Sequence, residues 1–129
     1  MNDHEIAVKI TEAELEVIRV LWESEKPLNI TELKDILCQK EHWSGDTVKT
    51  LLRRLCAKGA VGQEKRRVFY YYPLISAETY DKYALQRVID KLYSGSAQQL
   101  VVALFQNEQL SLADMEELRA LFRGKDGEK

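Results

Sequence analysis

Cysteine and histidine are scarce in this chain, and the few present are scattered. Its 129 residues include two cysteines, Cys38 and Cys56, and two histidines, His4 and His42. They form no Cys-x-x-Cys pair and no Cys/His cluster with the spacing of a zinc site. Both cysteines stand at apolar helical positions, so the sequence predicts two reduced, buried thiols and no metal or other cofactor.

Long hydrophobic runs are lacking as well. No stretch approaches the roughly 18 apolar residues that a membrane span needs. The first residues, 1–5, are polar and acidic, unlike a signal peptide. With 45% hydrophobic residues, the chain can build a core without metals or disulfides. We therefore expect a soluble, cytoplasmic protein that does not insert into a membrane.

The sequence also lacks the motifs of catalysis. It contains no Gly-rich phosphate loop, no His-Glu-x-x-His and no nucleophile elbow. Its acidic residues are spread over predicted helix surfaces, where they act as solvating groups or cap partners. The pattern predicts a protein that is not an enzyme and has no catalytic residues.

A net charge of −2 conceals a local excess of positive charge. Residues 1–43 hold five basic and ten acidic side chains, and residues 73–129 hold seven basic and nine acidic ones. Residues 44–72, by contrast, hold seven basic and two acidic side chains. Because salt screens exposed charges beyond about 10 Å, the local balance matters more than the total. The middle of the chain therefore favours a nucleic-acid partner.

Residues 44–58 have the spacing of an amphipathic helix. Four aliphatic side chains fall at i, i+3, i+4 and i+7, the stripe of a buried face: Val48, Leu51, Leu52 and Leu55. Hydroxyls and cations occupy the cap and the rest of the surface: Ser44, Thr47, Lys49, Thr50, Arg53 and Arg54. Such a helix suits the major groove of DNA. A solvated surface helix would show the same pattern, so both interpretations stay open here.

The elements around this helix predict a winged helix-turn-helix. A capping box at Thr11 and Glu14 opens a first helix that reaches about residue 24. After a very short strand at Leu28, a second helix begins with an apolar face: Ile30, Leu33, Ile36 and Leu37. Beyond the C′ residue Gly59, the period changes to two over 60–64 and 68–72, which indicates a β-hairpin.

The turn of this hairpin is basic. Lys65, Arg66 and Arg67 lie between the two predicted strands. A basic hairpin tip that follows a helix-turn-helix is what a winged helix presents to the DNA backbone. A charged, soluble hairpin would look the same. The basic turn therefore adds to the evidence for DNA binding from residues 44–58 but does not by itself indicate DNA binding.

The rest of the chain is helical. Helices are predicted over 76–93, 97–107 and from Ser111 to Gly124, so we expect a winged-helix domain at 1–73 and a three-helix dimerisation domain at 74–129. A segment of about 55 residues rarely buries this much apolar surface by itself, so we expect these helices to pack against a second copy of the chain. The predicted dimer contacts are Leu100, Val101, Leu104, Phe105, Met115, Leu118, Leu121 and Phe122. Packing back onto the winged domain is the alternative.

Several stretches carry a family resemblance. The most specific is Trp43-Ser44-x-x-Thr47-Val48-Lys49-Thr50-Leu51-x-x-Arg54-Leu55, joined by Glu14-Leu15-Glu16-Val17-Ile18, Leu21-Trp22, Lys58-Gly59 and Tyr70-Tyr71-Tyr72. Leu92-Tyr93-Ser94-Gly95 and Glu116-Glu117-Leu118-Arg119 support it. From about residue 10 to 123 the chain resembles the BlaI/MecI/CopY family of bacterial transcriptional repressors, and within it the penicillinase-repressor branch.

This resemblance implies a homodimeric repressor of a palindromic operator on double-stranded DNA, with an upstream membrane sensor-protease as a further partner. It places Thr47, Lys49, Thr50, Arg53 and Arg54 against DNA, and Lys65, Arg66 and Arg67 against phosphate. Two departures matter. No cysteine follows Cys56, which excludes the Cys-x-Cys metal sensing of the copper branch. Ala103-Leu104 stands where the beta-lactam repressors have a cleaved Asn-Phe bond.

Two other functions fit the same sequence. A winged helix can serve as a protein-interaction module, because a fold does not fix a function. A ligand-sensing regulator would bind a small molecule between the two domains, with Tyr80, Tyr83 and Tyr93 as candidate lining residues. Aromatic packing explains these tyrosines as well. The operator, the regulated genes and the inducing signal do not follow from the sequence.

Overall fold

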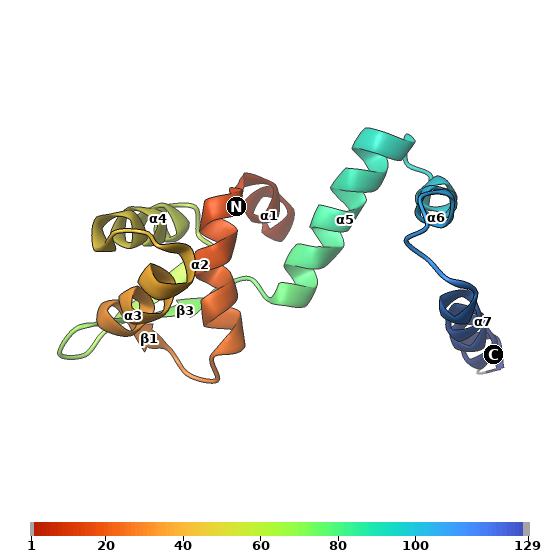
Figure 1. The fold of residues 1–129 in the computed structure, drawn as a ribbon. Helices are drawn as coiled ribbons and strands as arrows, with labels where there is room; N and C mark the ends of the chain where they lie inside the picture. The colour runs from red at the N-terminus through yellow and green to blue at the C-terminus, as the bar shows by residue number, and fades with distance from the viewer. Residues whose placement is uncertain (1, 128–129) are drawn as a thin grey trace. The chain divides into compact units, whose positions relative to one another are not determined.

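The computed structural model describes the backbone of residues 2–127 and the side chains of residues 2–121. Helices dominate over one small sheet, which confirms the predicted fold class (Figure 1). The elements are α1 (Asp3–Lys9), α2 (Glu12–Glu23), β1 (Leu28–Asn29), α3 (Ile30–Glu41), α4 (Gly45–Ala57), β2 (Val61–Lys65), β3 (Phe69–Pro73), α5 (Ala77–Tyr93), α6 (Ala97–Gln106) and α7 (Leu112–Gly127).

The chain divides into two compact units, Met1–Arg87 and Val88–Lys129, and the boundary lies inside α5. The predicted functional division into 1–73 and 74–129 stays a prediction, because compactness does not show where the DNA-binding part ends. None of the helices in the described part of the chain combines the length and hydropathy that a membrane span requires.

The core of the first unit lies where α2, α3 and α4 pack on one another and on the sheet. The predicted capping box at Thr11 is present, and a second capping box begins α3. Thr11 Oγ1 accepts from the Glu14 amide at 3.2 Å while Glu14 Oε1 accepts from the Thr11 amide at 3.0 Å, and Asn29 and Glu32 repeat the arrangement. These caps satisfy helix amides that have no partner within the helix, so they fix where α2 and α3 begin.

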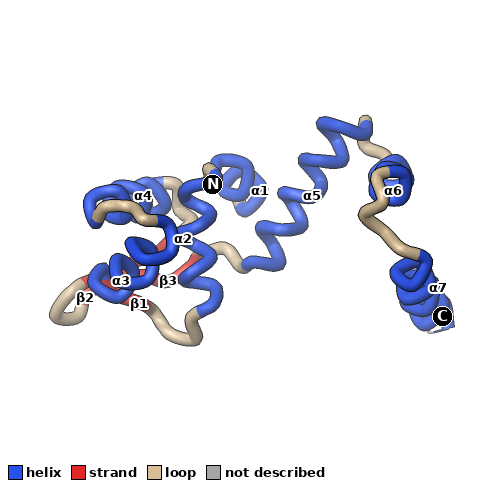
Figure 2. Tube along the Cα trace, in the orientation of Figure 1, coloured by secondary structure: helices blue, strands red, loops and turns tan. Residues whose placement is uncertain are grey.

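The sheet has the antiparallel order β1-β3-β2 (red in Figure 2). Leu28 pairs with Tyr71, which confirms the very short strand predicted before α3. The hairpin strands start one residue later than predicted, because the Ala60 amide donates to the Leu55 carbonyl at 3.0 Å and so closes α4. Gly59, with a φ of 80°, donates to Cys56 at 3.1 Å and completes this Schellman motif, as its predicted C′ role requires.

The helices differ from the predicted ones in three places. The polar N-terminus forms a helix, α1, because Ile6 and Ala7 reach the core and Asn2 caps the first turn. Ile36, predicted on the apolar face of the same helix as Leu33 and Leu37, is 42% exposed. α3 packs through a narrow stripe at Leu33 and Leu37, and Ile36 falls outside this stripe because it lies 100° around the helix from Leu37. α7 continues past Gly124 to Gly127, because an isolated glycine weakens a helix without always ending it.

Candidate nucleic-acid interface

The predicted amphipathic helix is α4, which begins after its N-cap Ser44 and ends at Ala57. Its aliphatic stripe is fully packed, with Val48, Leu51, Leu52 and Leu55 between 0% and 5% exposed. This stripe faces α2, α3 and β2. Burying four such side chains fixes the rotation of the helix about its own axis, and that rotation turns the opposite face toward solvent.

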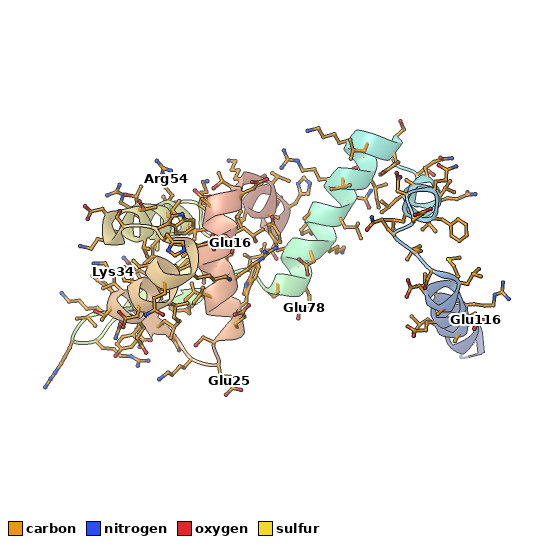
Figure 3. The ribbon with its side chains drawn as sticks, in the orientation of Figure 1. Glu16, Glu25, Lys34, Arg54, Glu78 and Glu116 are labelled. Atoms are coloured by element: carbon orange, nitrogen blue, oxygen red, sulfur yellow. The ribbon has the colours of Figure 1, made fainter. Side chains whose placement is uncertain are left out.

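The solvent face of α4 holds the predicted DNA-contacting side chains. Thr47, Lys49, Arg53 and Arg54 are exposed, and Thr50 is half-buried. Arg54 extends away from the core (Figure 3). Ser44 is different, because its Oγ accepts from the Thr47 amide at 3.2 Å and lies 3.1 Å from Thr47 Oγ1. Those two hydroxyls are therefore engaged with each other at the start of the helix.

Two grooves flank this face and separate its cations. The groove toward the sheet is lined by Ile30, Lys49, Leu52, Arg53, Cys56, Gln63 and Tyr71. The groove on the other side is lined by Asp46, Thr47, Thr50, Leu51 and Arg54. Lys49 and Arg53 thus stand on the sheet side of the helix, and Arg54 stands with the threonines.

The floor of the sheet-side groove carries no negative charge at neutral pH. Burial raises the pKa of the Cys56 thiol. Burial, followed by repulsion from Cys56, raises the pKa of Tyr71. Both groups therefore stay protonated, and Lys49 and Arg53 supply the only formal charge in this lining. The groove can accept an anionic group such as a phosphate without a competing anion.

One cation of the basic stretch is turned inward. Lys58 Nζ lies 2.5 Å from Glu14 Oε1 and donates to the Lys9 carbonyl at 2.8 Å. Glu14 is completely buried, and its Oε2 has no hydrogen-bond partner among the described residues. Sequence reasoning missed this ion pair, because its two partners lie 44 residues apart in the chain. Lys58 therefore stabilises the unit instead of adding to its outer charge.

The hairpin tip distinguishes its three cations. Lys65 ends β2, with Nζ 5.7 Å from the centre of the Phe69 ring. The Arg66 guanidinium lies 4.6 Å from the centre of the Tyr70 ring, and its Nη2 is 3.5 Å from Glu64 Oε2. Arg67 is exposed and has neither kind of partner among the side chains of residues 2–121. Cation–ring contacts of this kind restrict where Lys65 and Arg66 can point.

The predicted dimer contacts are incompletely covered. Val101, Phe105 and Leu121 are 43%, 49% and 70% exposed, and α6 has no buried residue. The other described members are half-buried: Leu100, Leu104, Met115 and Leu118. The side chain of Phe122 lies outside the described residues. These side chains leave a large apolar surface on the second unit.

Comparison with known proteins identifies the family of this chain. Residues 10–124 match the model of the family described as "Penicillinase repressor". The chain belongs to the penicillinase repressor family. Among its relatives, the penicillinase repressor of Bacillus licheniformis is 34% identical over 111 residues, which cover 85% of this chain and 86% of that protein. The methicillin resistance regulatory protein MecI of Staphylococcus aureus (strain N315) is 31% identical over 118 residues, 91% of this chain and 95% of that one.

Solved structures match a part of the chain. The solution structure of the DNA-binding domain of the repressor BlaI is 40% identical with a TM-score of 0.51, and covers 56% of this chain and 88% of that one. A monomeric form of Bacillus licheniformis BlaI in complex with the blaP half-operator gives 40% and 0.50 over the same shares. Membership in this family of DNA-binding transcriptional repressors confirms the resemblance, the winged helix and the expectation of a protein that is not an enzyme.

Proposed function

We propose that this penicillinase repressor family member represses transcription as a homodimer on a palindromic operator. The observation that carries the proposal is the solvent face of α4, where cations and hydroxyls stand on a helix whose rotation is fixed by its buried stripe. α4 is then the recognition helix, and it lies in the major groove of one half-site. The half-operator complex of the BlaI relative supports binding of one such unit to one half-site.

Each predicted contact has a role in this proposal. Lys49 and Arg53 take phosphates or guanine edges from the sheet side, and Arg54 takes them from the other side with Thr47 and Thr50 beside it. Ser44 caps the helix and directs its amide end toward the DNA backbone. The hairpin follows as the wing, whose cations contact phosphate: Lys65, Arg66 and Arg67.

The second copy of the chain completes the second unit. Its exposed apolar side chains need a partner, and an identical chain offers a self-complementary one. Two linked recognition helices then reach successive major grooves about 34–36 Å apart. Linkage raises affinity through effective concentration, so each half-site contact can be weak. We place this activity in the cytoplasm, where a bacterial repressor meets its operator.

The release signal is a separate matter. The resemblance implies an upstream membrane sensor-protease, and that partner stays a prediction. Ala103-Leu104, at the position of the family's Asn-Phe bond, lies inside α6. A protease selective for Asn-Phe would not recognise this bond, so a signal through cleavage would need a different sequence preference.

The proposal is tested by selecting genomic fragments with the purified full chain and titrating the selected duplex against salt. We expect a palindrome, bound by a dimer, with an affinity that falls steeply as salt rises because counterions are released from phosphates. The matched control is the chain with Lys49→Ala and Arg53→Ala, which keeps the buried stripe of α4.

Absence of any enriched sequence, with weak binding that ignores sequence, would overturn the proposal and favour the protein-interaction module. The ligand-sensing alternative gains nothing from its tyrosines in the first unit. Tyr80 packs on Trp22 with ring centres 5.6 Å apart, and Tyr83 packs against the hydrophobic core. Aromatic packing accounts for both side chains.

A further inference from the structure

The first helix, α1, lies outside the region that the family match covers. The match begins at residue 10, whereas α1 spans Asp3–Lys9. The helix is still an integral part of the first unit, because Ile6 and Ala7 are 7% and 5% exposed and belong to its core. α1 is therefore a packed element whose role the family match leaves open.

The C-terminal end of α1 meets the end of the recognition helix. Lys58, the C-cap residue of α4, donates from Nζ to the Lys9 carbonyl at 2.8 Å. Ile6 lies against the next residue, since its Cδ1 is 3.7 Å from where a Cβ on Gly59 would stand. α1 thus contacts both residues that follow α4.

The same helix also meets the first half of α5. Arg87 Nη1 donates to the Val8 carbonyl at 3.3 Å, and the rings of His4 and Tyr83 meet edge to face with centres 5.2 Å apart. Both α5 residues belong to the first unit. Carbonyls in the last turn of a helix lack partners within it and carry the negative end of its dipole. Two cations from two different elements, Lys58 and Arg87, satisfy them here.

We propose that α1 is a strap that fastens the first half of α5 to the end of the recognition helix. The inference rests on the proposed function, a homodimer on a palindrome. In such a homodimer, the direction in which α5 leaves the first unit (Met1–Arg87, called the winged unit from here on) decides whether both recognition helices reach their half-sites together. Arg87 is then a positioning residue that touches no DNA. It sets affinity for the whole palindrome and leaves affinity for a single half-site unchanged.

The test compares two duplexes, the selected palindrome and the same duplex with one half scrambled. Arg87→Ala removes the contact with α1, Arg87→Lys retains a donor, and Lys91→Ala removes a cation from α5 beyond the contact with α1. We expect Arg87→Ala to weaken binding to the palindrome by about threefold to tenfold and to leave the half-site duplex unaffected. Arg87→Lys should restore most of the loss, and Lys91→Ala should match the original chain.

Equal losses on both duplexes would overturn the strap, because they would show a local defect in the winged unit. Unchanged binding of Arg87→Ala to the palindrome would overturn it as well. If the unaltered chain selects no palindrome, the proposed function has failed instead.

Amide hydrogen exchange of residues 80–87 then decides the strap without DNA. Arg87→Ala should speed exchange there, Arg87→Lys should restore it, and unchanged exchange in Arg87→Ala would refute the fastening.

Discussion

The winged unit and the helices that follow it bury their apolar side chains to different extents. Among the described residues, every buried hydrophobic side chain lies at or before Ile75, except Ile89. In the second unit, Val101, Phe105 and Leu121 are between 43% and 70% exposed. The first unit therefore has a closed core of its own, while the second keeps much of its apolar surface uncovered.

Because of this difference, the stability of the first unit and the stability of the second unit should depend on different factors. A domain smaller than about 70–80 residues rarely stabilises itself from one core, and the second unit has too little buried surface even for that. Its stability should follow the concentration of a partner copy, whereas the stability of the winged unit should not. Folding and half-site recognition then belong to the first unit, and operator affinity also depends on the second.

The largest effect is expected from opening the core of the first unit. Leu55→Ala removes a side chain that is 0% exposed, and should lower the free energy of unfolding by about 2–5 kcal/mol. Urea unfolding followed by tryptophan fluorescence measures it, because both tryptophans, Trp22 and Trp43, lie in this unit. Leu121→Ala, 70% exposed in the single chain, is the comparison and should barely move this signal. Similar losses from both variants would remove the distinction between the units.

The next effect reverses the comparison by attacking the second unit. Phe105→Asp places a charge on its exposed apolar surface, and should dissociate the dimer and weaken operator binding by about 100-fold. Tryptophan-monitored unfolding should stay the same. Gln106→Asp is the matched control, since it adds the same charge about 100° around α6 from Phe105, at a residue outside the predicted dimer contacts. Sedimentation that still shows a dimer for Phe105→Asp would place the dimer contacts elsewhere.

Within the winged unit, removal of a cation from the recognition helix should cost less. Arg53→Ala or Arg54→Ala should each weaken operator binding by about 1–3 kcal/mol if the guanidinium reads a base. The unfolding free energy should not change, because both side chains are exposed. Titration of the selected duplex at fixed salt measures the loss, with Lys26→Ala as a cation outside the basic stretch. Undiminished affinity in both variants would remove α4 from the recognition role.

The features that follow from the sequence are those that local rules determine. The stripe from Val48 to Leu55 needs only helical spacing, and the caps at Thr11 and Asn29 need only residues three positions apart. Gly59 ends α4 because its φ of 80° suits glycine. These local features orient the solvent face of α4, so the candidate DNA-contacting side chains could be named in advance.

The features that were missed depend on contacts between distant parts of the chain. α1 has only 7 residues, and it is held by Ile6 in the core and by Arg87 from α5. The pairing of Lys58 with Glu14 likewise has no local signature. In the wing, the sequence does not indicate that Arg66 lies over the Tyr70 ring whereas Arg67 remains exposed. Helical spacing gives a direction for each side chain, but not the neighbour that it meets.

The smallest effect separates the two units by pH. Burial raises the pKa of Cys56, so the folded first unit holds this proton more tightly than the unfolded chain. Its stability should fall as pH rises past the ordinary thiol value of 9.0. The Ser111 amide donates to Asp114 Oδ2, and this bond, followed by the interaction with the Ser111 side chain, lowers the pKa of that carboxyl at the start of α7. The stability that this contact adds is present above the ordinary carboxyl value of 3.8, and is lost as pH falls through the lowered pKa.

Raising the pH should therefore first lower the stability of the first unit, as followed by tryptophan fluorescence. Lowering the pH should first reduce the helical circular dichroism that comes from the second unit. Cys56→Ser should flatten the alkaline limb alone, although Tyr71, with its raised pKa, keeps a residual loss at still higher pH. Asp114→Asn should flatten the acid limb alone. If both signals instead moved together at both limbs, the two units would unfold as one, and the contrast in their burial would not translate into separate stabilities.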